Sequence, residues 1–187
     1  MRVGVLALQG DFREHSALLD DMGFASVLVR KPEELDGIDA LVLPGGESTT
    51  IGKLADRYGL LDPLRAVIRG GIPTLGTCAG LIFLATGTTG PGQIHLGVLD
   101  VVVERNAFGR QVDSFEADLD VTGMPAPLHA VFIRAPVVAK AGADVEVLAA
   151  VGDDPVMVRQ GNILATSFHP ELIGETRVHE MALQREG

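Results

Sequence analysis

The only cysteine of the chain, Cys78, stands in the segment Gly76-Thr77-Cys78-Ala79-Gly80. Small neighbours let the backbone turn sharply, as in the nucleophile elbow of hydrolases, and would lift the side chain above a sheet edge. A strand is expected over residues 72–75 and a helix over residues 81–85, so free N–H groups and the helix dipole would favour the thiolate. The alternative is a small buried hydrophobe, the commoner state of a lone intracellular cysteine, but the flanking glycines favour a nucleophile.

A histidine and a glutamate follow another expected strand, in Ser167-Phe168-His169-Pro170-Glu171. Pro170 biases His169 toward an extended backbone, and the spacing lets the Glu171 carboxylate reach back to the imidazole. Beside Cys78, His169 could take the thiol proton and later protonate a leaving amine, while Glu171 holds the ring in the required tautomer. A solvated loop histidine remains the alternative for this motif alone. The histidines at positions 15, 95, 129 and 179 have no comparable setting and are expected to be structural or surface residues.

Two glycines lie in Pro44-Gly45-Gly46-Glu47-Ser48, between an expected strand over 39–43 and a helix that begins near Ser48. As a turn and helix cap, the segment would satisfy the first helical N–H groups through Glu47 or Ser48. It could also supply an oxyanion hole, because glycine lets the N–H of Gly46 point into a site, and the N–H of Ala79 could be a second donor. It is not a phosphate-binding P-loop, because the Gly-Lys-Ser/Thr ending is missing.

Two further segments place an arginine beside aromatic and polar residues: Arg105 within 104–111, and Arg134 directly after the β-branched run 131–133. Both segments could be surface loops. An amino-acid substrate, however, brings a carboxylate and an ammonium group, for which an arginine fork and an acidic or carbonyl group are natural partners. Taken together with Cys78, the two arginines are therefore candidates for substrate binding.

The pattern of short apolar runs and helix-period segments predicts an α/β protein with a mainly parallel sheet. The chain shows no linker or internal repeat, so we expect one domain over residues 1–187. A two-residue hairpin turn at Gly161-Asn162 is expected between the last two apolar runs. The first half predicts strands over 2–8, 25–29, 39–43 and 72–75, and helices over 13–22, 62–69 and 81–85. The β-branched runs of the second half predict antiparallel additions to the sheet over 98–103, 131–133, 145–151, 156–158 and 163–166, before a final helix over 175–184.

Charge and composition exclude several function classes. A net charge of -10 without runs of Lys or Arg argues against a nucleic-acid partner. The first apolar run ends at Gln9, which is too short for a signal peptide or a membrane span, so we expect a cytoplasmic protein without membrane contact. One cysteine excludes an internal disulfide and a cysteine-based metal cluster, and no metal site is predicted.

Several of these segments together resemble the class I glutamine amidotransferases. The segments are Pro44-Gly45-Gly46-Glu47-Ser48-Thr49-Thr50, Gly76-Thr77-Cys78-Ala79-Gly80, Arg105-Asn106-Ala107-Phe108-Gly109 and Phe168-His169-Pro170-Glu171. More narrowly, the chain is similar to the glutaminase subunits of pyridoxal phosphate synthase, and this similarity covers nearly its whole length. The narrower match adds Leu6-Ala7-Leu8-Gln9-Gly10, Gln111-Val112-Asp113-Ser114-Phe115-Glu116 and Ala130-Val131-Phe132-Ile133-Arg134-Ala135-Pro136.

The resemblance implies a flavodoxin-like three-layer α/β/α sandwich and a Cys78–His169–Glu171 triad that hydrolyses L-glutamine to L-glutamate and ammonia through a thioester. It also implies that there is no cofactor and that an obligate synthase subunit uses the ammonia to make pyridoxal phosphate. In related subunits the glutamine at the position of Gln9 lies toward the synthase, which makes Gln9 a candidate for coupling. The implied glutamine contacts are Gly46, Glu47, Ser48, Arg105, Ile133 and Arg134.

Three other interpretations stay open at this point. The chain could be a class I glutaminase of another pathway, or a cysteine hydrolase on the same fold, since a Cys–His–Glu set does not by itself specify glutamine. A non-catalytic module is the third, but it would not need all three residues. The chain also departs from the family at its end, where relatives usually carry a longer final helix with an aromatic residue.

Overall fold

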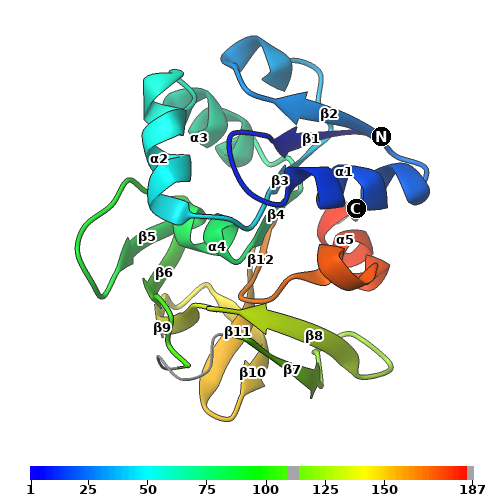
Figure 1. Cartoon of the computed structure of the whole chain (residues 1–187), viewed down its shortest axis with the longest axis vertical. Helices are drawn as coiled ribbons and strands as arrows, with labels where there is room; N and C mark the ends of the chain where they lie inside the picture. The colour runs from blue at the N-terminus through cyan, green and yellow to red at the C-terminus, as the bar shows by residue number, and fades with distance from the viewer. Residues whose placement is uncertain (109–113, 185–187) are drawn as a thin grey trace.

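A mixed sheet of seven strands forms the middle layer of the protein (Figure 1). The computed structural model describes residues 1–108 and 114–184. The strands are β1 (Arg2–Leu6), β2 (Ala25–Val29), β3 (Ala40–Leu43), β4 (Thr74–Thr77), β10 (Glu146–Val151), β11 (Asp154–Gln160) and β12 (Ile163–Thr166). In the order β2-β1-β3-β4-β12 they run parallel, and β11 and β10 then continue the sheet antiparallel.

Helices cover both faces of this sheet, as the apolar runs of its central strands require. One face carries α1 (Phe12–Asp21) and α5 (Thr176–Leu183), and the other carries α2 (Ser48–Arg57), α3 (Leu61–Arg69) and α4 (Ala79–Leu84) (Figure 1). Strand β3 is buried throughout: Leu41 and Leu43 pack with α2, α3 and α4, while Ala40 and Val42 pack on the other side. This is the predicted three-layer α/β/α sandwich with a mainly parallel sheet.

The elements predicted for the first half are confirmed to within a few residues, and so is the final helix. Two short 3₁₀ helices, η1 (Pro32–Leu35) and η2 (Pro170–Ile173), connect strands to the elements that follow. Among the described residues, we find no helix with the length and apolar character needed to cross a membrane.

The antiparallel additions are confirmed for β10 and β11, but three of the predicted strands are placed differently. Strand β12 is parallel to β4, because the hairpin turn at Gly161-Asn162, as predicted, reverses the chain after β11. Its four residues are all buried, which is typical of a central parallel strand. The other two strands leave the main sheet: β6 (Leu99–Glu104) pairs with β5 (Ala85–Thr88) and β9 (Val137–Ala141), and β8 (Leu128–Ile133) pairs with β7 (Ser114–Leu119).

The carboxyl ends of the parallel strands meet at one edge of the sheet, where open α/β proteins bind their ligands. The register pairs Thr166 of β12 with Thr77 of β4, so these two strands end side by side. Cys78 directly follows β4, and His169 follows β12 by three residues. The loops after β1 and β3 reach the same edge and bring Gln9 and the glycines of 45–46 to it.

Candidate active site

Cys78 lies in the sharp turn between β4 and α4 that the flanking glycines predict. Its backbone angles are φ +48° and ψ −100°, a conformation that is unfavourable for a residue with a side chain. The backbone N–H of Cys78 donates a hydrogen bond of 2.7 Å to the carbonyl oxygen of Thr166. A Cβ at Gly80 would collide with the carbonyl oxygen of Leu43, and one at Gly76 would collide with Leu84. The two glycines therefore let α4 pack close to the sheet with Cys78 at its first turn.

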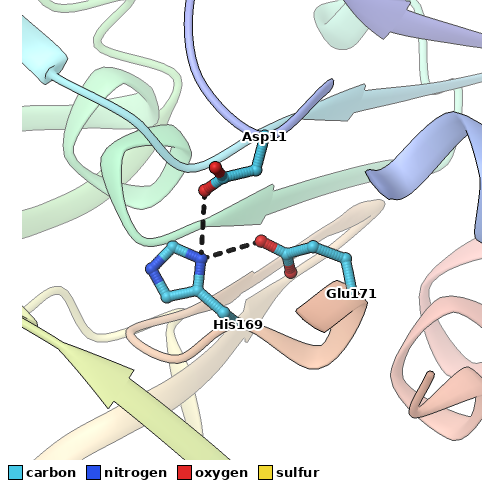
Figure 2. A group of neighbouring side chains, drawn as sticks. All are labelled: Asp11, His169 and Glu171. Carbon is cyan, nitrogen blue, oxygen red and sulfur yellow. Dashed lines mark hydrogen bonds and ion pairs between the residues drawn. The ribbon is translucent and has the colours of Figure 1, made fainter. Parts of the chain in front are cut away.

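His169 and Glu171 meet as predicted (Figure 2). His169 Nδ1 lies 2.7 Å from Oε1 of Glu171, and the His169 N–H donates to Val131 O at 2.9 Å. Cys78 lies near enough to raise the pKa of His169, and both residues line one cavity. Both His169 and Glu171 are buried, with exposed fractions of 4% and 6%. A sulfur, an imidazole and a carboxylate so connected can act as nucleophile, proton carrier and orienting group.

The protonation of the pair follows from its burial and its charges. Burial by itself lowers the pKa of His169. The hydrogen-bonding and charge effects of Cys78 and Glu171 outweigh burial and raise this pKa to about 10. Burial raises the pKa of Glu171, and the hydrogen bond with His169 opposes that rise. At neutral pH His169 therefore carries a proton next to the sulfur, which is the arrangement that an attacking thiolate needs.

A second carboxylate, that of Asp11, lies near the same ring nitrogen (Figure 2). Its Oδ2 is 3.4 Å from His169 Nδ1, and its backbone N–H donates to Gly45 O at 3.1 Å. The side chain of Asp11 is about a third exposed, whereas the side chain of Glu171 is fully buried. Sequence reasoning missed Asp11, although its place directly after the loop of β1 puts it at the ligand-binding edge of the sheet.

A cavity of about 350 Å³ opens above Cys78 and His169. Nearly all the residues predicted for the site line it, which brings together segments more than 100 residues apart in the sequence. The predicted residues among its walls are Gln9, Gly46, Glu47, Ser48, Cys78, Arg105, Ile133, Arg134 and His169. Glu171 lies behind His169 rather than in the wall, and Ala79 is buried beneath the elbow.

The backbone of this cavity is strained at three positions. Cys78, Asn106 and Arg134 are the non-glycine residues with positive φ in residues 1–108 and 114–184, and all three line the cavity. Such conformations cost about 1–3 kcal/mol each and gather at functional sites. A larger cavity, of about 680 Å³, lies at the opposite ends of β4 and β12, beside Arg159 and Gln184, and contains none of the predicted site residues.

The side chain of Glu47 caps α2, which confirms the cap interpretation of its segment. It accepts hydrogen bonds from the N–H groups of Thr49 and Thr50 at 3.1 and 2.7 Å. Burial alone would raise the pKa of Glu47, but these bonds and one from the Thr50 hydroxyl lower it to about 2. The N–H of Glu47 donates to Oε1 of Gln9 at 2.6 Å, so the Gln9 side chain is tied to the loop that holds Gly46.

Gln93 connects the two predicted binding loops, and no sequence pattern pointed to it. Its Oε1 accepts from the hydroxyl of Ser48 at 3.2 Å and from Nη1 of Arg105 at 3.1 Å. Arg105 also forms an ion pair of 3.5 Å with Glu47. These contacts hold the guanidinium at the rim of the cavity.

Gly109 and the segment 111–113, which belong to the quoted motifs, lie outside the described residues.

The other four histidines occupy three different settings. His129 is exposed and pairs with Glu116 and Asp118, as a surface residue would. His95 is partly buried against the carbonyl of Ile82. His15 and His179 are fully buried and face each other directly behind the triad, a placement that no spacing in the sequence indicated.

The sheet order and the elbow at the end of its central strand are those of the flavodoxin-like fold of class I glutamine amidotransferases. The chain matches the SNO glutamine amidotransferase family over residues 5–185. A curated relative from Pelotomaculum thermopropionicum, pyridoxal 5'-phosphate synthase subunit PdxT, is 58% identical over 99% of this chain and 95% of its own length. The PdxT of Thermus thermophilus is also 58% identical, over 99% of this chain and 97% of its own. A crystal structure of a glutamine amidotransferase, 57% identical, superposes with a TM-score of 0.92 and covers 97% of this chain and 96% of its own. The chain belongs to the SNO glutamine amidotransferase family.

Proposed function

We infer that the chain is the glutaminase subunit of a pyridoxal 5'-phosphate synthase: it hydrolyses L-glutamine to L-glutamate and delivers the ammonia to a synthase subunit. The observation that carries this inference is that Cys78 and His169 share the wall of a cavity that two arginines also line, with the His169 ring 2.7 Å from the buried carboxylate of Glu171. Membership of an amidotransferase family and the names of the relatives support the substrate and the pathway.

In the proposed mechanism, the Cys78 thiolate attacks the side-chain amide carbon of glutamine, and the carbonyl electrons move to the oxygen. Backbone N–H groups of Gly46 and Ala79 stabilise this oxyanion, each contributing about 2.7–4 kcal/mol to the transition state. His169 gives its proton to the leaving nitrogen, ammonia departs, and a glutamyl thioester remains on Cys78. Water then loses a proton to His169 and attacks the thioester, which releases glutamate and restores the thiolate.

The substrate fits the walls of the cavity. Arg105 and Arg134 supply cationic groups for the α-carboxylate, and backbone groups near Ile133 and in the loop 46–48 are available for the ammonium and the amide. Because the carboxylate of Glu47 is already used to cap α2, a contact of Glu47 with glutamine would come from its backbone. These binding roles are proposals for Gly46, Glu47, Ser48, Arg105, Ile133 and Arg134.

A partner enzyme is expected from the chemistry of ammonia. In neutral water ammonia is protonated, and its lone pair is then no longer available as a nucleophile. Transfer inside a complex avoids this loss, so we propose a hetero-oligomer with the synthase subunit. Gln9 is the candidate for coupling: its carboxamide accepts the N–H next to Gly46, so a partner that moves Gln9 also moves the proposed oxyanion loop. The proposal includes one amidotransferase domain over 1–187, in the cytoplasm, with no cofactor.

One experiment separates the open interpretations. The full chain is incubated with a glutamine-analogue electrophile, with and without excess glutamine, and its mass is measured; since Cys78 is the only cysteine, labelling there is unambiguous. We expect labelling that glutamine prevents, and none in Cys78→Ala. Labelling that glutamine does not prevent would support a different cysteine hydrolase and contradict the proposal.

The pathway is tested by assaying glutaminase activity of the chain, of a candidate synthase subunit and of both together, after co-purification. We expect a stable complex and a turnover that rises when the synthase is present. A chain that is equally fast alone, or that does not bind the synthase, would overturn the proposed partner while leaving the glutaminase assignment to the labelling result.

A further inference from the structure

We propose that His15 is a positioning residue of the glutaminase: its ring Nε2–H faces Glu171, fixes the orientation of that carboxylate and so sets the geometry of His169. This proposal rests on the proposed function, because it concerns the same triad. His15 comes from α1, more than 150 residues away from Glu171 in the sequence. The proposed positioning role of His15 is therefore separate from the roles of Cys78, His169 and Glu171.

The position of His15 joins both sides of the proposed catalytic machinery. Its Nε2 lies 3.4 Å from Oε2 of Glu171 and 3.0 Å from the hydroxyl oxygen of Thr77. Thr77 is the last residue of β4 and directly precedes Cys78. One buried ring therefore contacts the residue before the nucleophile and the carboxylate that orients the base.

Glu171 needs a donor on its second oxygen. Oε1 accepts from His169, while Oε2 is buried and forms no hydrogen bond with any residue of the described ranges. A buried carboxylate oxygen without a donor is costly, and burial already raises the pKa of Glu171. An N–H at 3.4 Å favours the ionised carboxylate electrostatically, and a small approach of the ring would complete the hydrogen bond.

A second histidine contacts the other ring nitrogen of His15, and the proposal assigns the proton of His15 to Nε2, which lies between the Thr77 hydroxyl and Glu171. Nδ1 of His15 lies 2.8 Å from Nε2 of His179, which comes from α5. Burial lowers the pKa of both rings, that of His15 well below its usual value and that of His179 to about 4. The positive charge of His169 lowers the pKa of His15 further, whereas Glu175 only partly opposes the shift of His179. Both rings are therefore neutral, and each has one N–H.

The two neutral rings form a directed pair. If Nε2 of His15 carries its proton toward Glu171, Nδ1 is an acceptor, and His179 supplies the matching Nε2–H. A neutral donor has an advantage over a cation here, because a lysine or arginine would neutralise Glu171 and weaken its interaction with His169. The pair thus supports the carboxylate without competing for its charge.

The test compares two substitutions at one position, in the complex with the synthase subunit. His15→Leu removes the donor at similar volume, and His15→Gln can place an amide N–H near the position of Nε2. We expect His15→Leu to lower kcat by about 10- to 100-fold, by analogy with the loss of residues that orient metal-binding side chains, with KM nearly unchanged. His15→Gln should restore most of kcat. The same Leu substitution at the exposed His129 is the matched control and should change neither constant.

Two further readouts distinguish positioning from stability alone. Loss of the donor raises the pKa of Glu171, so the acid limb of the kcat/KM profile of His15→Leu should move to higher pH by about one unit. In the wild type, ¹⁵N NMR of labelled histidines should find His15 neutral with its proton on Nε2, a measurement that does not depend on whether a variant folds.

The proposal would be overturned by a His15 proton on Nδ1, or by a folded His15→Leu enzyme with the kcat and pH profile of the wild type. Its failure remains distinguishable from failure of the proposed function. Glutamine-protected labelling of wild-type Cys78 tests the function and does not involve His15.

Discussion

Replacing Gly45 with alanine should damage the active site in a protein that still folds. The backbone of Gly45 lies outside the left-handed region, so alanine brings no backbone strain. Its Cβ, however, would lie 2.9 Å from Nδ1 of His169 and about 1 Å closer to Cε1 than ordinary van der Waals contact allows. The imidazole must therefore move by about 1 Å, and a misplacement of this size costs about 10²-fold in rate. The neighbouring Asp11 carboxylate, also 2.9 Å from the new Cβ, must move as well.

The assay is glutaminase kcat in the complex with the synthase, together with the free energy of unfolding in urea. We expect kcat to fall about 10²-fold and the unfolding free energy to fall by only about 1–3 kcal/mol, because the buried His169 side chain must move to admit the new carbon. Gly87→Ala is the matched control, since a Cβ there would have open space and should change neither quantity. A Gly45→Ala enzyme with wild-type kcat would refute the argument that His169 must occupy its observed position.

Three more predictions concern stability and the carboxylates. Gly80→Ala should lower the unfolding free energy by about 1–3 kcal/mol, measured in urea, because the new Cβ meets the backbone oxygen of Leu43, which cannot rotate away. Glu47→Ala should lower the unfolding free energy by about 1 kcal/mol at pH 7. Because the pKa of Glu47 is about 2 in the folded protein and 4.5 ordinarily, this stabilisation is lost as pH falls from 4.5 toward 2, and the urea midpoints of variant and wild type should converge. Glu171→Gln should lower kcat by at least about 10²-fold, whereas Asp11→Asn, at 3.4 Å rather than 2.7 Å from His169, should lower it by less than about threefold; equal losses would contradict these separate roles.

The parts of the site that sequence could predict are those encoded by local patterns. The elbow around Cys78 was predictable because only small neighbours permit its turn, and a Cβ at Gly80 would indeed collide with Leu43. The contact between His169 and Glu171 was predictable because one intervening proline leaves the two side chains within reach of each other. Each prediction needed only the residues of one short segment.

The residues that sequence reasoning missed act across elements. His15 and His179 belong to two helices that meet only after the sheet is assembled, and a lone histidine on a helix carries no sign of its partner. Gln93 lies in a Gly/Thr-rich loop, and its bond to Arg105 depends on the folding of both loops. Such contacts are long-range in sequence, so no period or spacing encodes them.

The direction of β12 shows how the chemistry could have corrected the topology. An antiparallel β12 beside β4 would place its carboxyl end, and with it His169, at the opposite edge of the sheet. The strand would then end about 13 Å away, at four residues of about 3.3 Å each, and residues 167–169 would have to run back along the sheet before His169 could reach Cys78. A parallel β12 brings His169 to Cys78 directly, because Thr166 then pairs with Thr77 and accepts the N–H of Cys78 through its carbonyl. The predicted triad therefore favoured a β12 that is parallel to β4, and the predicted hairpin with β11 allows that direction.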